Sequence, residues 1–179
     1  MDVIYGEMHT TLIRDMIEER IREDHKKYKF DYIPSEEAGE GQYFTKKDLR
    51  DAIRCTMYSI SDRSYRLGIE LGLPAIGIDK WRGLDLLGTS NMKRKHKIRE
   101  LHMLSVIDQY YELGNVCVLI GAVHIRKERE YKEDPSASIV YSSLKHNCLI
   151  HKYIDEQYMD TDIPPTDRKG IKIITTNLL

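Results

Sequence analysis

Cysteine, aromatic residues other than tyrosine, and long apolar runs are all scarce in this sequence of 179 residues. The three cysteines, Cys55, Cys117 and Cys148, are far apart, form no CxxC pair and leave one unpaired in any disulfide scheme. This pattern indicates a reducing cytoplasm rather than an oxidised scaffold. No apolar run approaches the ~18 residues of a membrane helix, and Asp2 with a charged helix stands where a signal peptide needs a basic and then an apolar segment. We therefore expect a cytoplasmic protein without a membrane partner.

Neither sign of charge is in excess, because 28 basic and 29 acidic side chains give a net charge of −1. This balance lacks the electrostatic signature of a general nucleic-acid binder. The basic stretch KRKHK at 93–97 is expected to be a solvated helix face. The sequence also lacks the GxxxxGK[ST] loop that cradles nucleotide phosphates. General nucleic-acid binding is therefore not expected.

Apolar patterning along the chain predicts strands that alternate with helices. Strands are predicted at residues 3–5, 29–33, 74–79 and 115–124, helices at 11–28, 45–72 and 91–113, and candidate later strands at 137–144 and 171–176. Pro34 is expected to end the second strand, and Gly72 and Gly114 to end the two later helices. The continuous apolar run NVCVLIGAVH is typical of a central strand buried on both faces.

This order of elements predicts one α/β domain over residues 1–179. Its sheet is expected to be mixed but mainly parallel and flanked by helices, with the functional site at the carboxyl ends of the strands. The core is expected at about 3–128, followed by a C-terminal part of undetermined role at 129–179.

Two of the predicted strands end in the same way. VIYGEMH carries Gly6, Glu7 and His9, and VLIGAVH carries Gly121 and His124. A glycine at this point allows a tight turn and the close approach of a ligand or backbone. Open α/β sheets bind their ligands at the carboxyl ends of strands. We therefore expect His9 and His124 to lie at one edge of the sheet.

Carboxylates end the other two early strands. Glu36 and Glu37 follow the second strand, and Asp79 ends the third. Glu36 is favoured over Glu37 because it directly follows DYIPS, although either could belong to the site. Asp79 could instead cap the segment that follows it. Four strands are thus expected to bring acidic and histidine side chains to one end of the sheet.

These motifs resemble those of the TraB/Tiki proteins, part of a wider group that includes erythromycin esterase and the ChaN-like haem-binding proteins. The matching segments are GEMH at 6–9, the Glu after the second strand, GID at 77–79, RELHML at 99–104 and GAVH at 121–124. The fourth is similar to an Arg-x-x-x-Met element that precedes the last core strand of the group. The resemblance covers residues 3–128 and implies an α/β fold with a mixed sheet and a polar site at the strand ends.

The resemblance also implies a set of site residues and a class of activity. By position, Glu7, His9, Glu36 and His124 form the site, with Arg99 as a nearby charged partner. The group includes metal-dependent peptidases and His-dependent esterases. We therefore expect a peptidase- or esterase-like hydrolase that acts on a small molecule or peptide, and that could be a homo-oligomer.

The residues themselves predict a divalent metal such as Mn, Co or Zn, so we expect the hydrolase to be metal-dependent. The candidate ligands combine imidazoles with carboxylates and would leave a position open for water: His9, His124, Glu36, Glu37 and Asp79. Metal-bound water ionises near neutral pH, and Glu7 would accept its proton. Arg99 would stabilise the negative charge that develops during attack.

A metal-free scheme uses the same residues and stays open. His9 would then activate water, and Glu7 or Glu36 would orient it. Two other functions also stay open: a binding protein for haem or another small ligand without turnover, and a viral or mobile-element protein that binds or cleaves a nucleotide signal. The remaining histidines show no partner in the sequence and are expected to be exposed: His25, His96, His102, His146 and His151.

Overall fold

The computed structural model describes residues 1–7, 11–39, 41–43, 63–79, 92–121, 124, 148–155 and 171–178. Within these residues, the strands are β1 (Asp2–Glu7), β2 (Ile33–Gly39), β3 (Gly41–Tyr43), β4 (Ala75–Asp79), β5 (Cys117–Gly121), β6 (Cys148–Asp155) and β7 (Ile171–Leu178). The helices are α1 (Thr11–Tyr28), α3 (Arg63–Leu71) and α5 (Met92–Tyr111).

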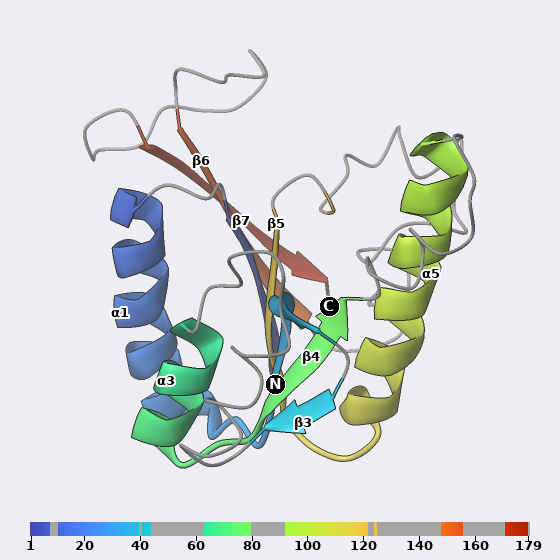
Figure 1. Ribbon diagram of the computed structural model, residues 1–179. Helices are drawn as coiled ribbons and strands as arrows, with labels where there is room; N and C mark the ends of the chain where they lie inside the picture. Colours follow the sequence, from blue (N-terminus) through green and yellow to red (C-terminus); the bar gives the residue numbers. More distant parts are fainter. Residues whose placement is uncertain are drawn as a thin grey trace.

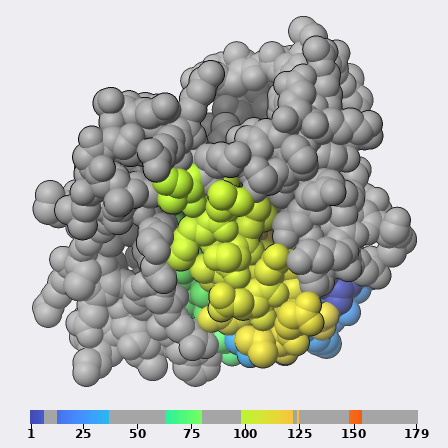
Figure 2. Space-filling model, turned by 90° about the vertical axis from the view of Figure 1, so that its right-hand side faces the viewer, coloured from blue at the N-terminus to red at the C-terminus, as the bar shows by residue number. Residues whose placement is uncertain are grey.

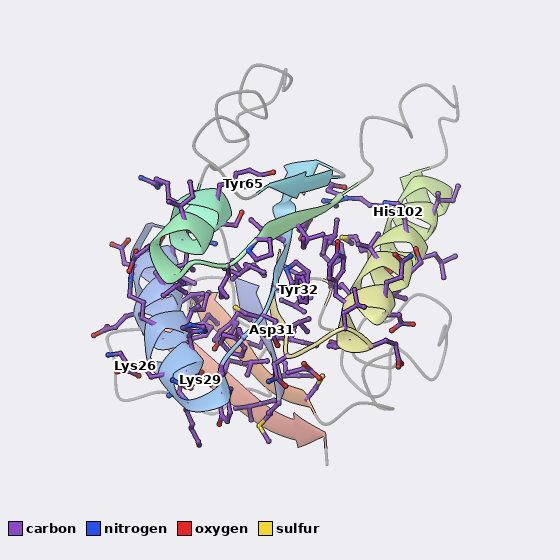
Figure 3. All side chains as sticks on the ribbon, turned by 90° about the horizontal axis from the view of Figure 1, so that it is seen from below. Lys26, Lys29, Asp31, Tyr32, Tyr65 and His102 are labelled. Carbon is purple, nitrogen blue, oxygen red and sulfur yellow. The ribbon has the colours of Figure 1, made fainter. Side chains whose placement is uncertain are left out.

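All described strands join one sheet in the order β3-β4-β2-β5-β1-β6-β7. The five inner strands, from β4 to β6, run parallel, and β3 and β7 are antiparallel strands at the two edges. Helices α1 and α3 lie on one face of the sheet and α5 lies on the other (Figure 1). The same three layers are seen from below in Figure 3, where Lys26 points away from the sheet. The predicted α/β fold with a mixed, mainly parallel sheet and flanking helices is confirmed.

The direction of the chain explains why α5 lies on a face of its own. From β1 through α1 to β2, and on through α3 to β4, the chain moves towards the β3 edge. From β4 through α5 to β5, it moves back. Right-handed crossovers place helices on opposite faces when the direction reverses. The reversal lies at the neighbouring strands β2 and β4, and open α/β sheets bind ligands beside such a point.

Buried side chains divide into two cores, one on each face. Helix α1 contributes Ile13, Ile17 and Ile21, which are spaced by one helical turn and fully buried. Helix α5 contributes Met103 and Ile107 on the other face. Tyr32 of the segment before β2, labelled in Figure 3, packs at a tilt against Tyr110 of α5, with ring centroids 5.0 Å apart.

Strand β5 is buried on both faces, as its apolar run predicts. Val118 and Ile120 belong to the core beneath α5, whereas Cys117 and Leu119 belong to the core beneath α1. Such two-sided burial is typical of a parallel strand covered by helices.

The end of α3 shows why Gly72 stops this helix. Gly72 has a φ of 72°, a conformation that favours glycine. The Leu73 N–H then turns back to donate to the Gly68 carbonyl at 2.7 Å, which closes a Schellman motif. A Cβ on Gly68 would lie 2.6 Å from the Leu73 oxygen, so the turn requires glycine there too.

The predicted second strand is wrong in its bounds. It was expected at 29–33 with Pro34 as its end, but β2 runs from Ile33 to Gly39. Pro34 has no N–H to donate to the ladder, and β2 meets β5 at a single register pair, Ser35 with Leu119. The register with β4 shifts between Ser35 and Gly39. The strand therefore continues past Pro34 as an irregular segment that carries Glu36.

Most of the other predicted helices and strands are present in the structure. Helices α1 and α5 and strands β1, β4 and β7 lie where the sequence predicts them, and α3 lies inside the predicted 45–72 segment. Strand β6 is missed by the sequence pattern, and the candidate strand at 137–144 lies outside the described residues. Within the described part of the chain, no helix has the length and apolarity needed to cross a membrane.

Candidate functional site

Glu36, in the middle of β2, is the centre of a charged cluster near the carboxyl ends of β4 and β5. Its Oε1 contacts both the Arg99 Nη2 and the His124 Nε2, the latter at 3.2 Å. Its Oε2 accepts a hydrogen bond of 2.6 Å from the Gly121 N–H at the end of β5. The register shift that holds Glu36 is the kind of strand irregularity that re-aims side chains near functional sites.

Arg99 joins β2 to β4 from the first half of α5. Its Nε and Nη2 donate to the two carboxylate oxygens of Asp79, at 2.8 and 3.2 Å, and Nη2 also reaches Glu36. The guanidinium thus holds one carboxylate from each of the two strands at the point where the chain reverses direction. Burial lowers the pKa of Arg99, but the two carboxylates outweigh it and raise the pKa above its usual value.

His124, just beyond β5, lies between two carboxylates. Its Nε2 faces Glu36, and its Nδ1 lies 3.0 Å from the Oε1 of Glu100. The side chains of His124 and Glu100 are only 3% and 4% exposed. A neutral imidazole carries one N–H, so both contacts are hydrogen bonds only when the ring is protonated.

The ionisation of the cluster follows from these contacts. Burial lowers the pKa of His124, but hydrogen bonds to Glu100 and Glu36 outweigh it and raise the pKa to about 9. Burial raises the pKa of Glu36, but His124, Arg99 and the Gly121 amide outweigh it and lower the pKa to about 2. Near neutral pH, the cluster therefore holds a carboxylate between two cations.

Four of the residues expected from the sequence meet in this cluster: Glu36, Asp79, Arg99 and His124. Glu7 is the last residue of β1, and its backbone is in register with Gly121, so it lies at the same edge of the sheet. The side chains of Glu7 and Glu37 lie outside the described part of the structure, as does His9. The segment that Asp79 could cap also lies outside it.

Glu100 is the cluster residue that sequence reasoning missed. It follows Arg99 directly and lies four residues before Leu104, which is buried in the core beneath α5. This spacing places Glu100 on the inner face of the helix, and a carboxylate there needs a partner. The outer face of α5 forms an exposed surface in Figure 2, and Leu101 on the helix is 41% exposed.

The described residues do not by themselves fit the expected metal. Among them, no group of three or more His, Cys, Asp or Glu side chains is arranged to hold an ion. Both ring nitrogens of His124 face carboxylates, and the guanidinium of Arg99 lies between Glu36 and Asp79, where it neutralises the oxygens that a metal would use. The metal remains a prediction that depends on His9 and its neighbours.

A second buried polar cluster lies on the opposite face, beneath α1. The Tyr5 hydroxyl and the Arg20 Nε both donate to Asp24 Oδ2, at 2.7 and 2.8 Å. His151 of β6 lies beside them, with its Nε2 3.7 Å from the same oxygen and its ring 5.6 Å from that of Tyr5. His151 is 4% exposed, so its expected exposure is wrong. Burial and then the nearby Arg20 charge lower its pKa to about 4.

No protein-family model, curated protein or solved structure matches this chain. The resemblance to the TraB/Tiki proteins therefore rests on the short motifs alone and stays a prediction. The function therefore has to be inferred from the geometry of the cluster around Glu36.

Proposed function

We propose that the protein is a hydrolase of the peptidase or esterase type, with its site at the cluster around Glu36. The observation that carries the proposal is the meeting of Arg99 and His124 on this one carboxylate. The cluster lies near the carboxyl ends of β4 and β5, beside the point where the chain reverses direction and α/β sheets bind ligands.

Each member of the cluster has a role that suits hydrolysis. His124, protonated near neutral pH, donates a proton to the leaving atom as the bond to the carbonyl carbon breaks. Arg99 stabilises the negative charge that develops on the carbonyl oxygen. Glu36 holds both cations in place, since it contacts each of them.

The attacking water needs a base, and we assign this role to Glu7, the last residue of β1, or to His9, which follows it in the sequence. The carbon–oxygen bond to water forms as His9 or Glu7 accepts the water's proton. This assignment is supported by the register of β1 with β5, which puts the backbone of Glu7 beside Gly121. No step requires a metal.

The charge of the cluster favours an uncharged or peptide substrate over a nucleotide. Its described members are three carboxylates, Glu36, Asp79 and Glu100, and two cations, Arg99 and protonated His124. The carboxylates are in excess even with His124 protonated, and a phosphate group would add further negative charge.

A panel of chromogenic esters, peptides and phosphodiesters tests the proposal. We expect the wild type to hydrolyse an ester or peptide, and Glu36→Gln to reduce kcat by roughly a hundredfold or more. Glu70→Gln is the matched control, because Glu70 is an exposed carboxylate that also pairs with an arginine, Arg22. Its activity should equal that of the wild type.

Three results would argue against this proposal. Equal turnover in the wild type and Glu36→Gln would show that the cluster takes no part in the reaction. A visible absorbance band without turnover would favour a haem-binding role. Near-stoichiometric Mn, Co or Zn in the wild type, lost in the His9→Ala/His124→Ala variant, would replace the metal-free scheme with the metal-dependent one.

A further inference from the structure

Glu100 is a buried carboxylate for which the hydrolytic scheme above has no role. It lies on α5 with 3% of its surface exposed, on the same helix face as the buried Leu104 and Ile107. A carboxylate buried in such surroundings is strongly destabilising unless it is paired. Its Oε1 lies 3.0 Å from the Nδ1 of His124.

The position of Glu100 fixes how the His124 ring can face the site. Helix α5 holds the Glu100 carboxylate on the Nδ1 side of the His124 ring, so the other nitrogen, Nε2, faces Glu36. A carboxylate that accepts from one imidazole nitrogen sets both the orientation of the ring and the nitrogen that carries the proton. Glu36 alone would not do this, because it contacts only Nε2.

We propose that Glu100 is a positioning residue that holds the Nδ1–H of His124 and so directs Nε2–H towards the substrate. This inference rests on the proposed hydrolase function. Glu100 acts through His124 and touches no reacting atom.

Replacement of Glu100 by glutamine removes the negative charge of the side chain and keeps its size. Glu36 stays as the charged acceptor and keeps the proton on Nε2 of His124. The glutamine amide carries no negative charge and so no longer favours the protonated ring, and we expect the neutral Nε2–H form with the amide donating to a bare Nδ1. The side-chain volume hardly changes, so the packing on the inner face of α5 is retained.

The test is a long-range ¹H–¹⁵N NMR spectrum of the histidine rings at neutral pH, with EDTA present. His124 is assigned by the loss of its signals in His124→Gln. We expect both ring nitrogens to be protonated in the wild type and in the control Glu112→Gln, an exposed carboxylate beyond the end of α5. In Glu100→Gln we expect Nδ1 to lose its proton.

Activity on a substrate found in the panel gives the second readout. Glu100→Gln should reduce kcat by roughly ten- to a hundredfold with little change in KM, because ground-state binding is not altered. Glu112→Gln should leave both constants unchanged.

A bare Nδ1 in the wild type would overturn the proposal, and this spectrum is decisive even if Glu100→Gln does not fold. An unchanged His124 signal in folded Glu100→Gln would overturn it as well. These outcomes are independent of the hydrolase proposal, because the spectrum needs no substrate. Absence of turnover with the expected spectra would reject the hydrolase and keep the Glu100–His124 contact.

Discussion

The sheet buries a histidine on each face, and the two are held in opposite states. His124, beneath α5, lies between Glu100 and Glu36, and its pKa is raised to about 9. His151, beneath α1, lies 3.7 Å from Asp24, and its pKa is lowered to about 4. Both are almost fully buried. Burial alone therefore does not decide the charge of a histidine in this protein.

The difference lies in the number of carboxylates beside each ring and in their distance. The carboxylate beside His151 is Asp24, whose Oδ2 lies 3.7 Å from Nε2 and already accepts from Tyr5 and Arg20, and the Arg20 charge opposes a second cation. Glu100 and Glu36 instead approach the two nitrogens of one ring. The cluster beneath α5 thus keeps His124 protonated near the carboxyl ends of the inner strands, whereas the cluster beneath α1 joins α1 to β1.

The largest expected effect comes from removing the carboxylate at the centre of the α5-side cluster. Glu36→Ala removes the carboxylate that the buried Arg99 and His124 share, so each keeps only one carboxylate, and the free energy of unfolding should fall by roughly 3–5 kcal/mol. Urea unfolding measures this. The control Glu70→Ala removes an exposed partner of Arg22 and should cost at most about 1 kcal/mol. Equal losses in the two variants would contradict the buried network.

The pH dependence of stability should differ in sign between the two histidines. The contribution of His124 is complete below its unfolded pKa of 6.5 and is lost as pH rises through about 9. The neutral, buried His151 instead costs stability as pH falls from 6.5 through about 4, because the unfolded chain takes up the proton first.

Unfolding midpoints measured across this pH range check both signs. His124→Gln should flatten the alkaline limb of the profile, and His151→Gln should flatten the acid limb. A variant that flattens the other limb, or neither, would show that the wrong cause has been assigned to that histidine.

A smaller effect is expected from Tyr5→Phe, which tests whether the α1-side cluster is structural. The variant removes one donor to Asp24, which keeps its hydrogen bond to Arg20. We expect a loss of about 1 kcal/mol in the free energy of unfolding and unchanged hydrolysis. A loss of activity with unchanged stability would move the functional site to this face of the sheet.

Much of the fold could be predicted because local patterns agree with the tertiary structure. The apolar run of β5 and the helical spacing of Ile13, Ile17 and Ile21 each indicate their element directly. Strand β2 could not be bounded, since Pro34 normally ends a strand and the register shift around Glu36 depends on its neighbours. Strand β6 was missed, with a buried His151 and a half-buried Lys152 interrupting its apolar pattern.

The candidate site was only partly predictable for a related reason. Strand ends mark Asp79 and His124, because parallel strands deliver their last residues to the same end of the sheet. Glu36 was expected to follow a strand that in fact continues to Gly39. Glu100 comes from a helix, and its role depends on a contact with a residue 24 positions away. The carboxylate beside His151 is Asp24, more than a hundred residues earlier in the chain, and no local pattern connects the two.

The most direct measurement compares hydrolysis by His124→Gln and His151→Gln on an ester or peptide that the wild type cleaves. Both variants replace a buried histidine with the same residue, and each is compared only after it has been shown to be folded. The account predicts that His124→Gln loses activity and that folded His151→Gln retains it. Retained activity in His124→Gln, or loss in folded His151→Gln alone, would contradict the assignment of the functional site to the α5 face.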